Sequence, residues 1–360
     1  GARIRSWCRL PVPGALRWSV DLTLGAGAAS AVLLAASLAG LVGRFPLLAI
    51  VTGLGCLGRW RVRRPVLPLV AAAIGGLLFL PVALGPPFFY DAMVYHLGLP
   101  WQALVEGGWH PHPENLFSTF PPLAQLLSLP PLAFGLARVP AILHWLAWVT
   151  AATAVFGLAR RFGTSTGIAG LATATVLVLP VTPMVPGFPA AEGWLLVGLI
   201  PAVALAAGPC RGASAALAGV LAGVATAARL QGIPWSLLVF LLVGIQCRGR
   251  LRTLGVTVGC WLVGTSPWWS KNLVLLGDPA APLFWHREGM ETLWRDSQSM
   301  LRRGGSPVDA LAAIPRLLAP EVLWLLPLLV VGLIAVMTRR RTLVLSATVV
   351  FGLAAWPATG

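Results

Sequence analysis

One stretch of the sequence carries far more ionisable chemistry than the rest. Residues 88–122 read FFYDAMVYHLGLPWQALVEGGWHPHPENLFSTFPP and hold three of the 11 acidic residues and three of the five histidines of the chain. Asp91 and Tyr95 are four residues apart, so a helix through this stretch would place their side chains on one face. Such a concentration indicates a site that binds or reacts, or a polar segment at a membrane surface.

Two interpretations are open from these residue types alone. The first is an interfacial helix whose aromatic residues Tyr90, Tyr95 and Trp101 lie at the level of lipid headgroups. The second is a metal site, since the stretch offers the ligands Asp91, His96, His110, His112 and Glu114. Their spacing matches no tight zinc motif such as HExxH, whereas carboxylates suit a hard divalent cation. No cofactor is otherwise indicated, and a cation, if present, is expected on Asp91 and Glu192.

The composition predicts what kind of elements position this stretch. The 360 residues are 57% hydrophobic and only 10% charged, with a mean hydropathy of +0.83. Soluble domains carry about 25% charged residues, so we predict an all-α polytopic membrane protein with membrane lipids as its surroundings. The net charge of +15 comes from arginine clusters between apolar runs. The arginines form no single basic face, so we expect no nucleic-acid partner.

Apolar runs predict about 11 transmembrane helices, some of them short. They lie at 22–43, 45–58, 65–85, 139–159, 164–185, 190–208, 212–228, 231–247, 253–269, 320–338 and 342–357. The arginine clusters between the runs all fall on one side of the predicted membrane, as expected for cytoplasmic loops. Connections 86–138 and 270–319 are therefore predicted to lie outside. The proline-rich segment 122–136 is too short to span and is predicted to be a juxtamembrane helix.

Three regions follow from this arrangement. We expect an N-terminal tail and helical hairpin at 1–64, a catalytic membrane core at 65–285 that contains outer loop 86–138, and a second outer loop with C-terminal helices at 286–360. The sequence lacks an initial Met and stops after an apolar run, so we expect that one or both ends continue. The expected location is the inner (cytoplasmic) membrane, with the site on the extracytoplasmic face.

Three stretches, in this order, resemble motifs of bacterial membrane glycosyltransferases of the GT-C superfamily. They are YDAMVYHLGLPWQALVEGGWHPHPENLFSTFPPLAQLL in the first outer loop, GVLAGVATAARLQGIPW at 219–235 and SPWWSKNLVLLGDPAAPLFW at 266–285. The resemblance extends over residues 65–285 and is closest to polyprenyl-phosphate-sugar-dependent enzymes that are dolichyl-phosphate-mannose-mannosyltransferase-like or aminoarabinose-transferase-like. It implies transfer of a hexose or pentose, with inversion, from a lipid carrier to a lipid, glycan or protein acceptor.

The resemblance also implies roles for individual residues. Asp91 would be the general base and Glu192 a second catalytic carboxylate. Substrate-binding roles fall on Tyr95, His96, Glu114, Asn115, Arg229, Lys271 and Asn272. Arg229 stands where a lysine is expected, and Asp278 where the motif has asparagine. The main alternative is a transporter or flippase for a lipid-linked or small anionic substrate, in which the same charged residues would line a pathway near the bilayer midplane.

Overall fold

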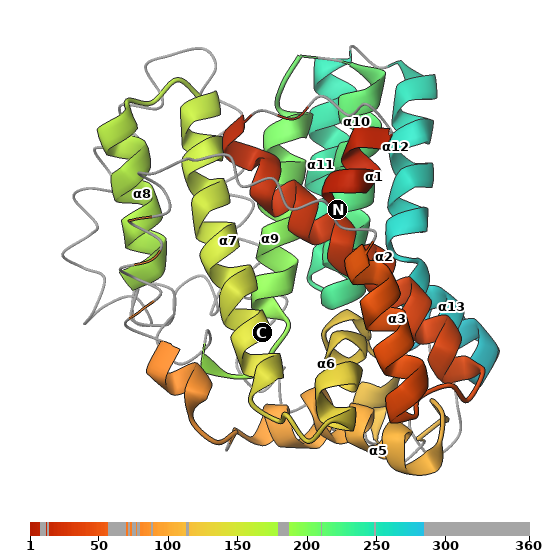
Figure 1. Ribbon diagram of the computed structural model, residues 1–360. Coiled ribbons are helices and arrows are strands. Elements are labelled where there is room, and N and C mark those ends of the chain that lie inside the picture. Colours follow the sequence, from red (N-terminus) through yellow and green to blue (C-terminus); the bar gives the residue numbers. More distant parts are fainter. Residues whose placement is uncertain are drawn as a thin grey trace, which may run out of the picture. The chain divides into compact units, whose positions relative to one another are not determined.

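The computed structural model of the chain is helical, and no strand occurs in the residues that it describes (Figure 1). All of them belong to one compact unit, Gly1–Leu283. The described residues are 1–7, 12, 14–56, 70, 73, 77, 80–87, 89–112, 115–178, 187–209, 211–247 and 250–283.

The helices follow the apolar runs of the sequence. Their bounds are α1 Ala2–Trp7, η1 Gly14–Leu16, α2 Arg17–Leu38, α3 Arg44–Cys56, η2 Ala92–His96, α5 Gly98–Glu106, η3 Leu116–Thr119, α6 Leu123–Ala133, α7 Val139–Arg161, α8 Thr166–Val178, α9 Glu192–Ala206, α10 Gly212–Ala228, α11 Gly232–Gln246, α12 Leu251–Gly264 and α13 Ser266–Leu276. Eight of the predicted segments thus have helical counterparts, and α6 matches the predicted juxtamembrane helix. The predicted segments at 65–85, 320–338 and 342–357 lie largely or wholly outside the described residues.

One predicted segment is divided into two helices. The run 253–269 forms α12 and the beginning of α13, with a break at Thr265. Pro267 lies in the first turn of α13, where its missing N–H leaves no hydrogen bond unmade. The break lets α13 leave the line of α12 and continue to Leu276, where Gly277 ends it in a left-handed conformation (φ 72°).

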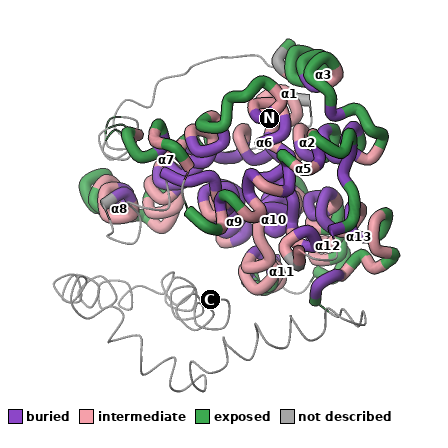
Figure 2. Tube along the Cα trace, turned by 90° about the horizontal axis from the view of Figure 1, so that it is seen from below, coloured by how far each residue is buried: buried purple, intermediate pink, exposed green. Residues whose placement is uncertain are grey.

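The centre of the bundle is a row of helices in the order α8, α7, α9, α10 and α12 (Figure 2). Helix α10 has the sequence GASAALAGVLAGVATAA and is buried along nearly its whole length. Small residues allow its backbone to approach its neighbours closely, since a methyl group on Gly223 would lie 2.8 Å from Cα of Gly264 in α12. Helices α3 and α8 lie at the periphery (Figure 2); α3 is largely exposed, and α8 is partly exposed.

The two ends of the bundle differ in composition. At one end α7 finishes with Arg160 and Arg161, and α10 and α12 begin next to Arg211 and Arg250. At the other end α7, α9 and α11 begin and α10 and α12 finish, close to η2, α5 and α6 (Figure 1). The polar stretch that opened the sequence analysis thus lies at the end opposite these arginines.

Among the described residues, two helices are long and apolar enough to cross a membrane, Gly14–Leu38 and Val139–Arg161. The other apolar helices have 10 to 17 residues. A helix of 17 residues is about 25 Å long, whereas the hydrocarbon core of a bilayer is about 30 Å thick.

Candidate functional site

Asp91 and Tyr95 meet on a single π-helical turn. Asp91 precedes η2, and the Tyr95 hydroxyl donates to its Oδ2 at 3.1 Å. The Tyr95 ring stacks on Phe117, with centroids 4.4 Å apart and planes 15° apart. Single π-turns inside helices often mark functional sites. The hydrogen bond orients the carboxylate and uses one of its two oxygens.

Arg229 and Glu192 form an ion pair at the same end of the bundle. Glu192 is the first residue of α9, and Arg229 ends α10 because its backbone is extended there. Nη1 of Arg229 lies against Oε1 of Glu192, and Nε donates to Oε1 of Gln231 at 2.8 Å. Both charged side chains are about one-third exposed, at 34% and 32%. The pair is therefore reachable from solvent or from a bound molecule.

The two pairs act on one another electrostatically. Burial raises the pKa of the Tyr95 phenol, the Asp91 charge raises it further, and Arg229 acts in the opposite direction. Burial lowers the pKa of the Arg229 guanidinium, whereas Tyr95 and Asp91 favour its charged form. The structure thus brings together four of the predicted site residues: Asp91, Tyr95, Glu192 and Arg229. They combine a phenol donor, two acidic side chains and one guanidinium.

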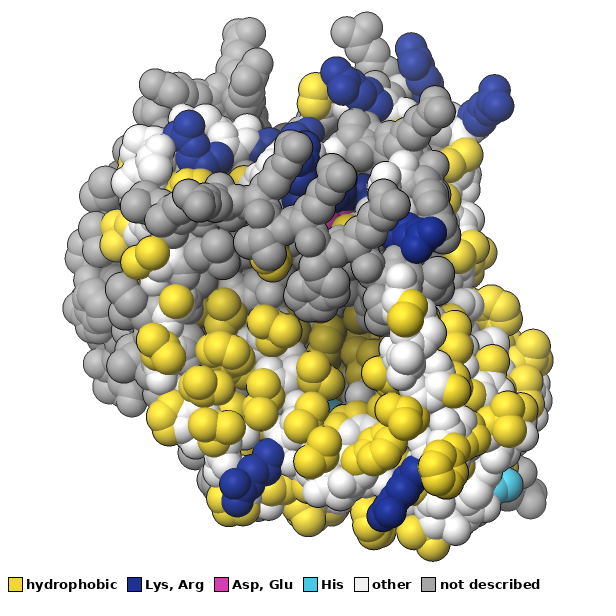
Figure 3. Space-filling view, in the orientation of Figure 1, with side chains coloured by type: hydrophobic (Ala, Val, Ile, Leu, Met, Phe, Trp, Pro, Cys, Tyr) yellow, Lys and Arg dark blue, Asp and Glu magenta, His cyan; other side chains and the backbone are white. Residues whose placement is uncertain are grey.

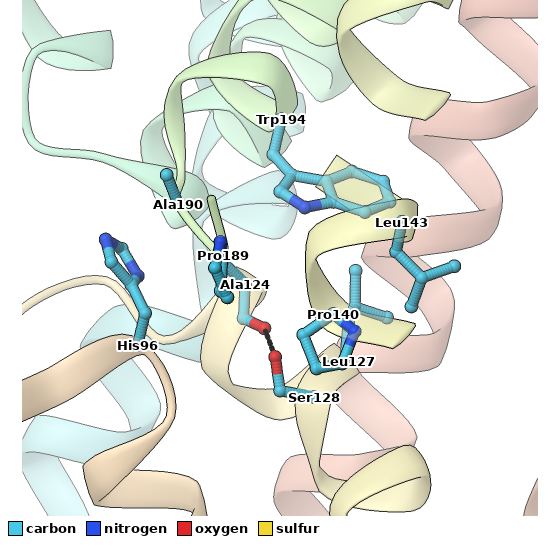
Figure 4. A pocket seen from close by; sticks show the side chains of 9 residues that line it. All are labelled: His96, Ala124, Leu127, Ser128, Pro140, Leu143, Pro189, Ala190 and Trp194. Atoms are coloured by element: carbon cyan, nitrogen blue, oxygen red, sulfur yellow. Dashed lines mark hydrogen bonds between the residues drawn. The ribbon is translucent and has the colours of Figure 1, made fainter. Parts of the chain in front are cut away.

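His96 lies next to this group and is almost fully buried, at 6% exposed. Burial, His144 and Arg229 together lower its pKa to about 3, so the imidazole is neutral. It borders a small pocket opposite Trp194, with Ser128, Pro140 and other residues of α6, α7 and α9 (Figure 4). Its Nδ1 has no hydrogen-bond partner.

His144 is a neighbour that the sequence analysis did not identify. Its Nε2 accepts a hydrogen bond of 2.9 Å from the backbone N–H of Gly193, one of the free donors at the start of α9. A methyl group on Gly193 would lie 2.9 Å from the backbone oxygen of His144, so only glycine allows this contact. His144 thereby fixes the helix end that carries Glu192. The available signal was a single histidine within the apolar run 139–159.

Lys271 and Asn272 are not part of this group. Both are fully buried on α13, and all the hydrogen bonds found for Lys271 Nζ and Asn272 Nδ2 go to backbone oxygens. Asn115 caps η3 by accepting from the N–H of Phe117 at 3.0 Å. Glu114 lies outside the described residues.

In the described part of the chain, no group of three or more His, Cys, Asp or Glu side chains is placed to hold a metal ion. Asp91 and Glu192 supply two carboxylates near one end of the bundle, and His112 lies instead 3.5 Å from Glu106, measured from Nε2 to Oε2.

Comparisons with family models, with curated proteins and with solved structures found no match to this chain.

Proposed function

We propose that the chain is a polytopic membrane glycosyltransferase that moves a sugar from a polyprenyl phosphate to an acceptor at the extracytoplasmic face. The observation that carries the proposal is the grouping of Asp91, Tyr95, Glu192 and Arg229 at one end of a helical bundle. Three motifs in the order expected for GT-C enzymes support it, because two of them contribute to this group.

The distribution of side chains favours a membrane environment. Among the described side chains of the face in Figure 3, apolar ones cover the middle, whereas arginines lie toward the two ends. Large apolar residues are exposed on several helices, including Phe45 at 86%, Val263 at 67% and Leu171 at 59%. In water such a surface favours aggregation, whereas lipid tails cover it at no cost. Helices shorter than the hydrocarbon core are compatible with local thinning of the bilayer.

Asp91 suits the role of general base. In the proposed step Asp91 takes the proton of the acceptor hydroxyl, the acceptor oxygen attacks the anomeric carbon, and the bond between that carbon and the phosphate oxygen breaks with inversion. Tyr95 holds one carboxylate oxygen, which leaves the other for the proton. Such proton transfer contributes about 10²- to 10⁴-fold to a rate.

Arg229 suits the departing phosphate. A guanidinium offers several donors in a planar fork that matches phosphate oxygens, and stabilising charge that develops on a leaving group is a major source of catalysis. Glu192 neutralises Arg229 when no donor is bound. A donor phosphate would compete with Glu192 for the guanidinium, and the released carboxylate could then hold the acceptor or a cation.

The decisive experiment is a transfer assay with purified protein. A short polyprenyl phosphate that carries a radiolabelled hexose serves as donor, with a membrane extract as the source of acceptors. Asp91→Asn should reduce transfer by about 10²-fold or more while donor binding survives. Glu106→Gln is the matched control, because Glu106 lies on the neighbouring helix α5 and pairs with His112 instead. Near-normal turnover of a folded Asp91→Asn protein would refute the role of Asp91.

A further inference from the structure

One face of α13 donates hydrogen bonds to two segments, the turn 115–120 in the first polar stretch and the backbone oxygen of Ala281. Trp268, Lys271 and Asn272 are at most 5% exposed and are spaced to share that face. Trp268 Nε1 and Asn272 Nδ2 both donate to the backbone oxygen of Thr119, at 3.2 and 2.8 Å. Lys271 Nζ donates to the backbone oxygens of Ser118 and, at 2.8 Å, of Phe120. Three consecutive carbonyl groups of the turn are thus held by α13.

The arrangement leaves Lys271 no access to a substrate. Its side chain is 0% exposed, and in the described part of the chain no carboxylate pairs with it. Burial lowers the pKa of the Lys271 amine to about 7. In either protonation state its N–H groups satisfy backbone carbonyls that would otherwise be unpaired at the end of η3. A buried lysine whose donors all go to backbone oxygens indicates a positional role, because an apolar residue would leave these carbonyls without partners.

The same turn contacts the proposed catalytic group. Phe117 stacks on Tyr95, and Asn115 Nδ2 lies 3.4 Å from the backbone oxygen of Val94, to which it donates. Tyr95 in turn donates to Asp91. A continuous set of contacts therefore leads from α13 through the turn 115–120 to the carboxylate.

We propose that Lys271 and Asn272 are positioning residues, which hold the turn 115–120 and, through Phe117, keep the Tyr95 hydroxyl on Asp91. The inference assigns them a role different from the substrate binding expected from the sequence. Its catalytic consequence rests on the proposed function, whereas its structural content does not.

The chain offers a probe that is independent of activity, because Tyr90 and Tyr95 are its only tyrosines. Full-length protein labelled with 3-fluorotyrosine should give two ¹⁹F signals, which Tyr90→Phe assigns. Lys271→Met removes the donors at similar length and should shift the Tyr95 signal. Asn272→Leu should also shift the Tyr95 signal, and it serves as the second variant if Lys271→Met does not fold. The Tyr90 signal should stay in place, because Tyr90 is 70% exposed.

Ser270→Ala is the matched control on the same helix, since the Ser270 hydroxyl donates only within α13, to the Ser266 oxygen. It should leave both signals unchanged. An unshifted Tyr95 signal in folded Lys271→Met or Asn272→Leu protein would overturn the inference.

Kinetics provide the second readout. Lys271→Met should lower kcat about 10- to 100-fold, as expected for a misplaced catalytic group, while KM for a hexosyl polyprenyl phosphate stays within about twofold. In the Asp91→Asn background the same change should have almost no further effect on kcat, because it acts through Asp91. A raised KM with unchanged kcat would instead identify Lys271 as a donor ligand and overturn the inference. Absence of transfer by the wild-type chain would count against the proposed function alone, because the fluorine spectrum reports on the turn in either case.

Discussion

Gly223 and Gly264 bring α10 and α12 into backbone contact, and Gly223→Ala should therefore destabilise the protein. A methyl group at position 223 would lie 2.3 Å from the backbone oxygen of Trp261 and 2.8 Å from Cα of Gly264. Carbon contacts are optimal at about 3.5–4.0 Å, so the helices would have to separate by about 1 Å. The atoms concerned belong to the backbone, and no change of side-chain rotamer can relieve the overlap.

Two opposing terms set the size of the effect. Overpacking a close contact costs about 1–3 kcal/mol, whereas alanine gains up to about 1 kcal/mol over glycine in helix propensity. The hydrogen bond between Trp261 Nε1 and Thr226 Oγ1, 3.2 Å long, crosses the same seam and would weaken as the helices separate. We expect a net loss of about 2 kcal/mol. Gly259→Ala on α12 is the matched control, because its methyl group would meet nothing within 4 Å and should be neutral or stabilising.

Thermal unfolding in detergent, followed by the fluorescence of the 16 tryptophans, measures the difference. A loss of 1 kcal/mol lowers Tm by about 2–4 °C in chains of 150–250 residues, so Gly223→Ala should melt several degrees below the wild type at the same heating rate. Gly259→Ala should not. A Gly223→Ala protein as stable as the wild type, or a loss of equal size in both variants, would refute the proposed contact between the helices.

Three further predictions concern the site, the seam and the orientation. Arg229→Ala should impair use of the lipid-linked donor in the transfer assay more than Arg229→Lys, which keeps the charge and loses the fork; equal losses would indicate a bidentate or packing role. Trp261→Phe should cost about 1 kcal/mol, visible as a lower Tm, because a hydrogen bond contributes about 0.5–1.5 kcal/mol and the single Nε1–H is shared between Thr226 and Ser236; an unchanged Tm would contradict this. An impermeant thiol reagent should label Val105→Cys from outside intact cells and spare Leu251→Cys, both positions being over 70% exposed; the reverse pattern would overturn the orientation.

Local features of the structure could be predicted from the sequence. Apolar runs located α10 and α11 to within a residue or so, because glycine and polar residues interrupt the runs at their ends. The spacing of Asp91 and Tyr95 predicted that they share a face, and their hydrogen bond confirms it. The predicted segments 212–228 and 231–247 placed Arg229 between two helices, and in the structure it lies between α10 and α11.

Pairings between distant residues could not be predicted in this way. Nothing in the sequence couples Glu192 to Arg229, because the pair depends on how α9 packs on α10. Burial of Lys271 was unexpected for the same reason. A lysine side chain usually ends in water. Here the backbone carbonyl groups of the turn 115–120 replace water as its hydrogen-bond partners. The break at Thr265 could not be predicted either, because Pro267 is also compatible with an uninterrupted helix that ends nearby.

The ion pair of Arg229 and Glu192 has a consequence for the order of events in the proposed reaction. A neutral lipid gains little by displacing Glu192, whereas a phosphate brings the charge needed to compete for the guanidinium. The donor is a phosphodiester with one negative charge, and the released polyprenyl phosphate carries nearly two at neutral pH. The product therefore competes more strongly than the donor. Return of Glu192 to Arg229 would then assist the departure of the spent carrier. Each turnover would depend on Glu192 competing with the bound phosphate for Arg229.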